Sequence, residues 1–127
     1  MNVVDSSGWL EYFGDGPNAA YFAGPLAKAD DLIVPAISVF EVFKRVLQQR
    51  DEASALQAAA LMQQGRVVAL DPALAMTAAK LSFELKLPMA DSIILATARQ
   101  FNALLWTQDA DFENLPGVRY VAAARTR

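Results

Sequence analysis

The segment from Leu87 to Phe112, LPMADSIILATARQFNALLWTQDADF, constrains the fold more than any other part of this sequence. Because Leu87-Pro88 disfavours helical backbone, a helix is expected to start just after it, with Asp91 in the first turn. Asn102 is a residue type that ends helices, and the apolar run Ala103–Trp106 has the length of a strand. The segment therefore predicts a loop, a buried helix, a strand and a second loop.

The lengths of these elements predict that two carboxylates meet. A helix from Asp91 to Phe101 advances about 15 Å, and a strand from Ala103 to Thr107 returns about 13–17 Å. The helix of a βαβ layer runs antiparallel to its strands. Asp91 and Asp109 are therefore expected at the same edge of the sheet, the carboxyl edge, where ligand sites of open parallel sheets lie.

Short apolar runs alternate with helical segments along the rest of the chain. Strands are expected at 2–4, 32–34, 66–70, 103–107 and 119–121, and the third is expected to be an edge strand. Helices are expected at 9–13, 18–29 with a kink at Gly24-Pro25, 38–49, 51–64, 72–85 and 89–101, before a tail at 122–127. This order predicts a single α/β domain over residues 1–127, with a mostly parallel sheet of four or five strands and helices on both faces.

Four acidic residues fall where these elements reach the carboxyl edge. Asp5 follows the first strand, Glu41 lies near the start of the helix after the second, and Asp91 and Asp109 complete the set. Each has another interpretation. Asp5, Ser6 and Ser7 are helix-capping types, and Ser38-x-x-Glu41 matches a capping box in which the glutamate bonds back to the cap.

Composition limits the chemistry that these acids can perform. The chain of 127 residues has no cysteine and no histidine, which excludes thiolate chemistry and removes the commonest general base. Crowded carboxylates repel one another unless a cation is present. Mg²⁺ or Mn²⁺ takes oxygen ligands and makes displacement at phosphorus feasible without histidine. Such ions also explain how a chain of net charge −3 could meet a polyanion. No apolar run of membrane-spanning length and no signal peptide is present, so a cytoplasmic protein is expected.

At these residues the sequence resembles the PIN-domain family, and within it the VapC-type toxins of type II toxin–antitoxin systems. The resemblance rests on VVDSS around Asp5, SVFEV around Glu41, LPMADSIILATA around Asp91 and LLWTQDADF around Asp109. It implies a three-layer α/β/α sandwich and an acidic quartet of these residues that binds Mg²⁺ or Mn²⁺ and cleaves single-stranded or structured RNA.

By the same resemblance, Ser7 and Thr107 are accessory residues of the site. Asp111 belongs to the Asp-x-Asp-Phe ending and is either an outer-sphere metal ligand or a loop cap, and we favour the cap. The resemblance further implies a homodimer and a cognate VapB-like antitoxin encoded alongside, assembling into a heterotetramer or a larger complex.

Aromatic residues in the first third of the chain indicate where such an antitoxin would bind. They are Trp9, Tyr12, Phe13, Tyr21, Phe22, Phe40 and Phe43. Because exposed aromatic patches mark interfaces, we expect the helix around 9–13 and the helices at 18–24 and 38–49 to form a groove for an amphipathic antitoxin helix. A basic side chain of that partner could then reach the acidic site. The alternative is that most of these aromatic residues are core.

Three functions other than a nuclease are the alternatives for this chain. A haloacid-dehalogenase-like phosphatase needs Asp-x-Asp after the first strand, but position 7 is serine. A phosphoacceptor receiver domain needs adjacent acids at the end of that strand, whereas Asp5 is followed by two serines. The third rival is a PIN-like module that binds RNA or protein without cleaving it.

Overall fold

The computed structural model describes residues 1–124, and the tail arginines Arg125 and Arg127 lie outside the described residues. Strands alternate with helices, as the sequence predicts. The strands are β1 (Asn2–Val4), β2 (Ile33–Pro35), β3 (Arg66–Val68), β4 (Leu104–Thr107) and β5 (Val118–Tyr120). The helices are α1 (Ser6–Phe13), α2 (Ala19–Leu26), α3 (Ala36–Gln49), α4 (Glu52–Met62), α5 (Pro72–Leu85) and α6 (Met89–Gln100), with 3-10 turns η1 (Ala29–Asp31) and η2 (Ala110–Phe112).

All the paired strands run parallel. β4 lies between β1 and β5, and β2 pairs with β3. A parallel bridge between Asn2 and Leu32 joins the two groups, which gives the spatial order β3-β2-β1-β4-β5. β3 is the expected edge strand but ends at Val68 instead of residue 70. Because the strands are parallel, their carboxyl ends share one edge, and the loops after β1 and β4 lie side by side there.

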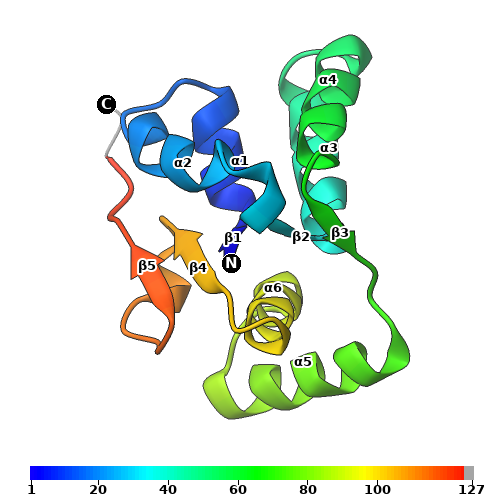
Figure 1. Cartoon of the computed structure of the whole chain (residues 1–127), viewed down its shortest axis with the longest axis vertical. Coiled ribbons are helices and arrows are strands. Elements are labelled where there is room, and N and C mark those ends of the chain that lie inside the picture. The colour runs from blue at the N-terminus through cyan, green and yellow to red at the C-terminus, as the bar shows by residue number, and fades with distance from the viewer. Residues whose placement is uncertain (125–127) are drawn as a thin grey trace.

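Helices cover both faces of the sheet. Figure 1 shows α5 and α6 on one side and α1 to α4 on the other. Alternate strand residues point to opposite faces. Val3 and Leu105 pack toward α6, while Val4 and Trp106 pack toward α1 and α2. Each layer therefore has its own apolar core, which confirms the expected α/β/α sandwich.

Two helices begin earlier than the sequence predicts. α1 starts at Ser6 instead of residue 9, directly after its N-cap Asp5. α3 starts at Ala36, with Pro35 at the cap position, so Ser38 is already the third helical residue. The Ser38 side chain is fully buried and its hydroxyl has no hydrogen-bond partner among the described residues. The alternative interpretation of Ser38-x-x-Glu41 as a capping box therefore does not apply, because Ser38 is the third residue of α3 and not its cap.

Glycine explains how α1 lies so close to the sheet. A Cβ atom on Gly8 would sit 2.6 Å from Val4 Cγ1 and 2.7 Å from Phe22 Cε1, both on fully buried side chains. The absence of a side chain at this position lets α1 pack directly on β1 and α2. This close packing holds the first turn of α1, and with it Asp5, at the carboxyl edge.

Other local signals act as expected, with smaller changes of length. Asp71 caps α5 through the Leu74 N–H at 2.8 Å, and Asn102 adopts a positive φ of 51° just after α6. The predicted helix at 18–29 is shorter. Pro25 lies in the last turn of α2, and residues 29–31 form the separate turn η1.

No helix among residues 1–124 combines the length and the apolar character needed to cross a membrane.

Candidate metal centre

Asp5 is the buried centre of the carboxyl edge. Its side chain is 2% exposed, yet both carboxylate oxygens are hydrogen-bonded. Oδ1 accepts from Ser7 Oγ at 2.7 Å and from the Gly8 N–H at 2.9 Å. Oδ2 accepts from Thr107 Oγ1 at 2.7 Å. Asp5 is thus both the N-cap of α1 and a carboxylate of the site, so the two interpretations of the sequence are compatible.

Thr107 connects the two loops that carry the acids. Its hydroxyl donates to Asp5 and accepts from the Asp109 N–H at 2.8 Å. The residue is fully buried at the end of β4, which is paired with β1 in a register that places Val4 opposite Trp106. Strand pairing and one threonine hydroxyl therefore set the position of Asp109 relative to Asp5.

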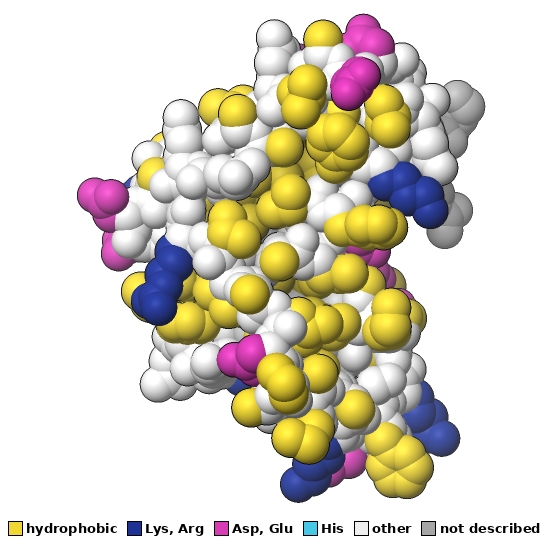
Figure 2. All heavy atoms as spheres, turned by 90° about the vertical axis from the view of Figure 1, so that its right-hand side faces the viewer, with side chains coloured by type: hydrophobic (Ala, Val, Ile, Leu, Met, Phe, Trp, Pro, Cys, Tyr) yellow, Lys and Arg dark blue, Asp and Glu magenta, His cyan; other side chains and the backbone are white. Residues whose placement is uncertain are grey.

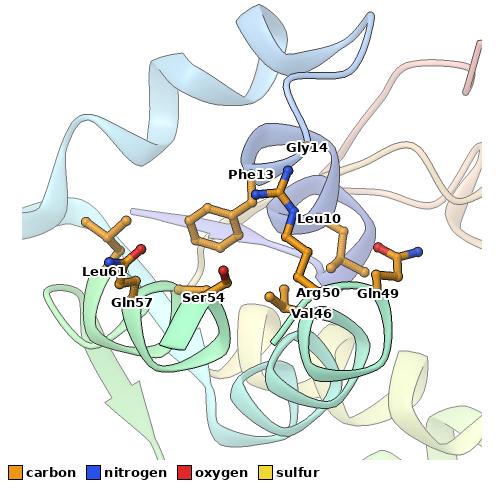
Figure 3. Close-up of a pocket in the computed structure, with 10 residues that line it drawn as sticks. Leu10, Phe13, Gly14, Val46, Gln49, Arg50, Ser54, Gln57 and Leu61 are labelled. Atoms are coloured by element: carbon orange, nitrogen blue, oxygen red, sulfur yellow. The ribbon is translucent and has the colours of Figure 1, made fainter. Parts of the chain in front are cut away.

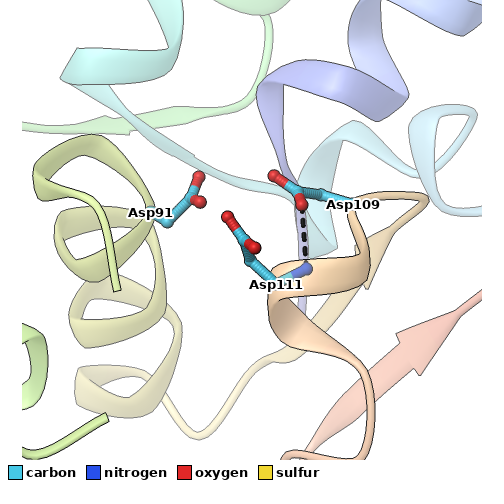
Figure 4. Close-up of side chains that lie close together, drawn as sticks. All are labelled: Asp91, Asp109 and Asp111. Carbon is cyan, nitrogen blue, oxygen red and sulfur yellow. Dashed lines mark hydrogen bonds between the residues drawn. The ribbon is translucent and has the colours of Figure 1, made fainter. Parts of the chain in front are cut away.

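Asp91, Asp109 and Asp111 form a compact group of carboxylates (Figure 4). Each offers one oxygen, and these three oxygens lie within 4.8 Å of one another. Asp91 comes from the first turn of α6, and the other two come from the loop and the turn after β4. The close approach of Asp91 and Asp109 confirms the expectation drawn from the helix and strand lengths.

Burial and mutual repulsion perturb the acids of this site. Burial, followed by the charge of Asp109, raises the pKa of Asp91 to about 8, and the charges of Asp111 and Asp5 act in the same direction. Burial also raises the pKa of Asp5 to about 6, against the lowering effect of its hydrogen bonds with Thr107, Ser7 and Gly8. In the absence of a cation, burial and like charge therefore favour the protonated form of Asp91.

Glu41 is bonded to the start of α1 by a residue that the sequence did not single out for this role. Ser6 Oγ donates to Glu41 Oε1 at 2.6 Å. Ser6 follows Asp5 directly, so the bond ties the first half of α3 to the start of α1. Glu41 lies outside the trio of converging oxygens and one turn deeper into its helix than predicted.

Comparison with known proteins identifies the fold. Residues 3–118 match the PIN domain. The chain belongs to the PIN-domain family. The predicted PIN-like fold is thereby confirmed. No curated protein matches the sequence.

Solved structures with this PIN fold include VapC toxins. A toxin–antitoxin complex from Klebsiella pneumoniae is similar with a TM-score of 0.76 and 24% identity, over 94% of this chain and 96% of that one. VapC20 of Mycobacterium tuberculosis, described as a sarcin–ricin loop cleaving toxin, has a TM-score of 0.74 and 17% identity over 88% and 92%. VapBC2 of Rickettsia felis, bound to a DNA fragment from its promoter, has a TM-score of 0.72 and 16% identity over 95% and 97%. At these identities the likeness concerns the fold.

The structure corrects the role expected for Asp111 in this PIN domain. The sequence favoured Asp111 as a loop cap, but Asp109 is the cap of η2 and accepts from the Asp111 N–H at 2.9 Å. The Asp111 side chain instead points toward Asp91 (Figure 4). Asp109 accepts from the N–H two residues further on, as aspartate commonly does in turns, and the Asp111 carboxylate is not used by this bond.

The residues present fit a hard divalent cation. Carboxylate oxygens from three residues converge, and a fourth carboxylate, Asp5, is close enough to affect the pKa of Asp91. Mg²⁺ and Mn²⁺ prefer oxygen donors of this kind and need only one or two direct carboxylates. A cation here would offset the repulsion that raises the pKa of Asp91.

Proposed function

We propose that this PIN domain is a Mg²⁺- or Mn²⁺-dependent endoribonuclease and the toxin of a type II toxin–antitoxin pair, acting in the cytoplasm. The observation that carries the proposal is the convergence of Asp91, Asp109 and Asp111 next to the buried Asp5. Family membership supports nuclease activity. The likeness in fold to a VapC toxin described as cleaving the sarcin–ricin loop supports RNA as the substrate.

Each residue has a distinct part in this proposal. Asp5, Asp91, Asp109 and Glu41 would hold the cation, and Asp111 would contribute a further oxygen. When bound, the cation lowers the pKa of a coordinated water and neutralises developing charge on a phosphodiester. Thr107 and Ser7 keep the Asp5 oxygens oriented through their hydroxyl groups. A bound cation would favour the ionised form of Asp91, because the raised pKa of this residue results from burial and like charge.

RNA cleavage by the purified protein tests this function. We expect cleavage with MgCl₂ or MnCl₂, none with EDTA, and none by the Asp91→Asn variant, whose fold should stay intact in circular dichroism. Metal-stimulated RNA binding without cleavage would instead support the rival of a silent PIN-like module. Sequencing the 5′ ends of RNA after brief induction would then identify the target.

A groove between α1 and the α3–α4 hairpin is our candidate for the antitoxin site (Figure 3). Its volume is about 190 Å³. Leu10, Phe13, Val46 and Leu61 supply apolar walls, and Arg50 lies at its side. The groove suits the apolar face of an amphipathic helix. The groove is thus lined by α4, whereas the sequence predicted that the helix at 18–24, which is α2, would line it.

Burial of the aromatic residues explains this change. Trp9 and Phe22 are core residues, and Tyr21 packs against the same core, so α2 presents little aromatic surface. Tyr12 and Phe40 are exposed, as expected. Hydrogen exchange with and without the co-encoded partner tests the site. We expect protection in α1, α3 and α4, whereas protection confined to α5 would contradict the assignment.

We also propose a homodimer, formed through α5. Figure 2 shows hydrophobic side chains gathered on the face that includes α3, α4, β3 and α5. On α5 and at the start of α6, Phe83 is 87% exposed and Met76 and Met89 about 70%. Leu70 and Phe83 line an apolar hollow beside Met89. Light scattering of the pure toxin should give a dimer mass, and Phe83→Glu should give a monomer. A monomeric wild-type protein would rule this contact out.

A further inference from the structure

An exposed aromatic ring lies in the second turn of α3. Phe40 is 60% exposed, although it is the residue directly before Glu41. Lys44 Nζ lies 5.9 Å from the centre of the Phe40 ring, within the range of a cation–π contact. Single exposed apolar side chains are common and need no explanation. The combination of a ring, a cation over its face and an adjacent site carboxylate is more specific.

Positive charge is concentrated next to this ring. Lys44 and Arg45 follow Glu41 by three and four residues, so both lie on the side of α3 that carries Glu41. Within residues 1–124 the salt bridge that forms is Lys80–Glu84, so neither cation is paired in the described part of the chain. In a chain with net charge −3, two unpaired cations one helical turn beyond Glu41 are a local attraction for a polyanion.

A hydrogen bond links Glu41, the neighbour of Phe40 on α3, to the segment that carries Asp5. Glu41 is bonded to Ser6, and Ser6 follows the buried Asp5. α3 starts directly after β2, at the carboxyl edge of the sheet, and Phe40 and Glu41 lie in its second turn. A strand of RNA that extends from the acids past Glu41 would lie over this part of α3.

We propose that Phe40, Lys44 and Arg45 form a docking surface for an unpaired nucleotide next to the cleaved phosphodiester. The Phe40 ring stacks on the base, and the two cations contact the flanking phosphates. Proteins that bind single-stranded RNA combine aromatic stacking with a cationic track in this way. Bases inside a duplex cannot reach the ring, so this surface favours RNA that is single-stranded at the cut. This inference rests on the proposed ribonuclease function.

Binding of a short, unstructured, fluorescently labelled RNA tests the surface without depending on cleavage. Fluorescence anisotropy would be measured in EDTA on the Asp91→Asn protein, which cuts no RNA and carries one acid fewer. In this background Phe40→Ala should weaken binding by about fivefold to a hundredfold, the range of one base–aromatic stack. Phe40→Trp should bind at least as well as the parent, because it keeps a stacking face.

Lys44 and Phe40 should affect the salt dependence of RNA binding differently. Lys44→Gln should reduce the slope of log affinity against log salt concentration by about 0.7, the value for one phosphate contact on a single strand. Phe40→Ala should leave that slope unchanged. The matched control is Leu47→Ala, since Leu47 is a 45% exposed apolar residue on the same helix without an aromatic face, and it should bind RNA normally.

Cleavage kinetics on the otherwise wild-type protein provide a second measurement. Phe40→Ala should raise KM for single-stranded RNA and leave kcat within about twofold. If the Phe40→Ala protein binds RNA as tightly as the parent Asp91→Asn protein does, the proposed docking surface is wrong. Equal losses for Phe40→Ala and Leu47→Ala, with a change of mass in light scattering, would also overturn it, because they would show that a second copy covers this face. A wild-type protein that binds the RNA through Phe40 but never cuts it would reject only the nuclease.

Discussion

Removing the charge of Asp91 should stabilise the metal-free protein. Its pKa is raised from 3.8 to about 8 by burial and by the charge of Asp109. A carboxyl group with a raised pKa in the folded state binds its proton more tightly there than in the unfolded chain. The folding stability of the metal-free protein therefore falls as pH rises from about 4 to about 8. Asparagine resembles the protonated acid, so Asp91→Asn removes this loss.

The size of the gain follows from the pKa difference. At pH 7 the ordinary pKa of 3.8 is about 3 pH units away, and each unit corresponds to about 1.4 kcal/mol. A fully buried carboxyl would therefore lose about 4 kcal/mol. Asp91 is only half-buried, so solvent screening reduces the effect to roughly 1–2 kcal/mol. For a domain of this size that corresponds to a rise in Tm of roughly 3–12 °C.

Thermal unfolding in EDTA between pH 5 and pH 8 measures this effect. Wild type should lose Tm relative to Asp91→Asn as pH rises, and MnCl₂ should raise the Tm of wild type more than that of the variant. The matched control is Asp51→Asn, at the exposed cap of α4. Its pKa is lowered by hydrogen bonds from Ser54, so that substitution should not stabilise the protein.

Other results would show that the Asp91 carboxyl does not destabilise the metal-free protein. If Asp91→Asn melts below wild type in EDTA at pH 7, or if the two proteins share one pH dependence, the carboxyl is not destabilised by its neighbours. An equal MnCl₂ effect on both proteins would place the cation elsewhere.

Three further substitutions test the structure around the acids. Glu41→Gln should keep the Tm, since an amide oxygen can still accept from Ser6. It should strongly lower both the Mn²⁺ affinity measured by calorimetry and the rate of RNA cleavage. Unchanged affinity and rate would exclude Glu41 as a metal ligand. Gly8→Ala should cost about 1–3 kcal/mol in urea unfolding through overpacking, whereas Gly24→Ala, with open space around it, should cost nothing. Thr107→Val should lower the free energy of unfolding by about 1–3 kcal/mol and raise the pKa of Asp5 further. Thr107→Ser keeps the hydroxyl, so its stability and the pKa of Asp5 should be close to those of wild type. Equal stability and equal pKa values in the two variants would show that the hydroxyl does not have this effect.

Local chemistry in the sequence determined where several elements begin and end. Leu87-Pro88 excludes helix and places Asp91 in the first turn of α6, Asn102 ends that helix with a positive φ, and Asp71 caps α5. These signals act through the backbone of neighbouring residues, so they work without knowledge of the fold. Together with element lengths they were sufficient to bring Asp91 and Asp109 to one edge.

Tertiary packing decided the features for which local chemistry left two answers. Ser38 could cap a helix, but α3 starts at Ala36 directly after β2, and Ser38 is buried in its first turn. At the Asp-x-Asp pair, the Asp109 N–H donates to Thr107 Oγ1 and Asp109 is the cap of η2, which leaves Asp111 facing Asp91. The Ser6–Glu41 bond joins residues 35 positions apart. Such contacts depend on how β1, β2 and β4 align, and no pattern within one segment contains that information.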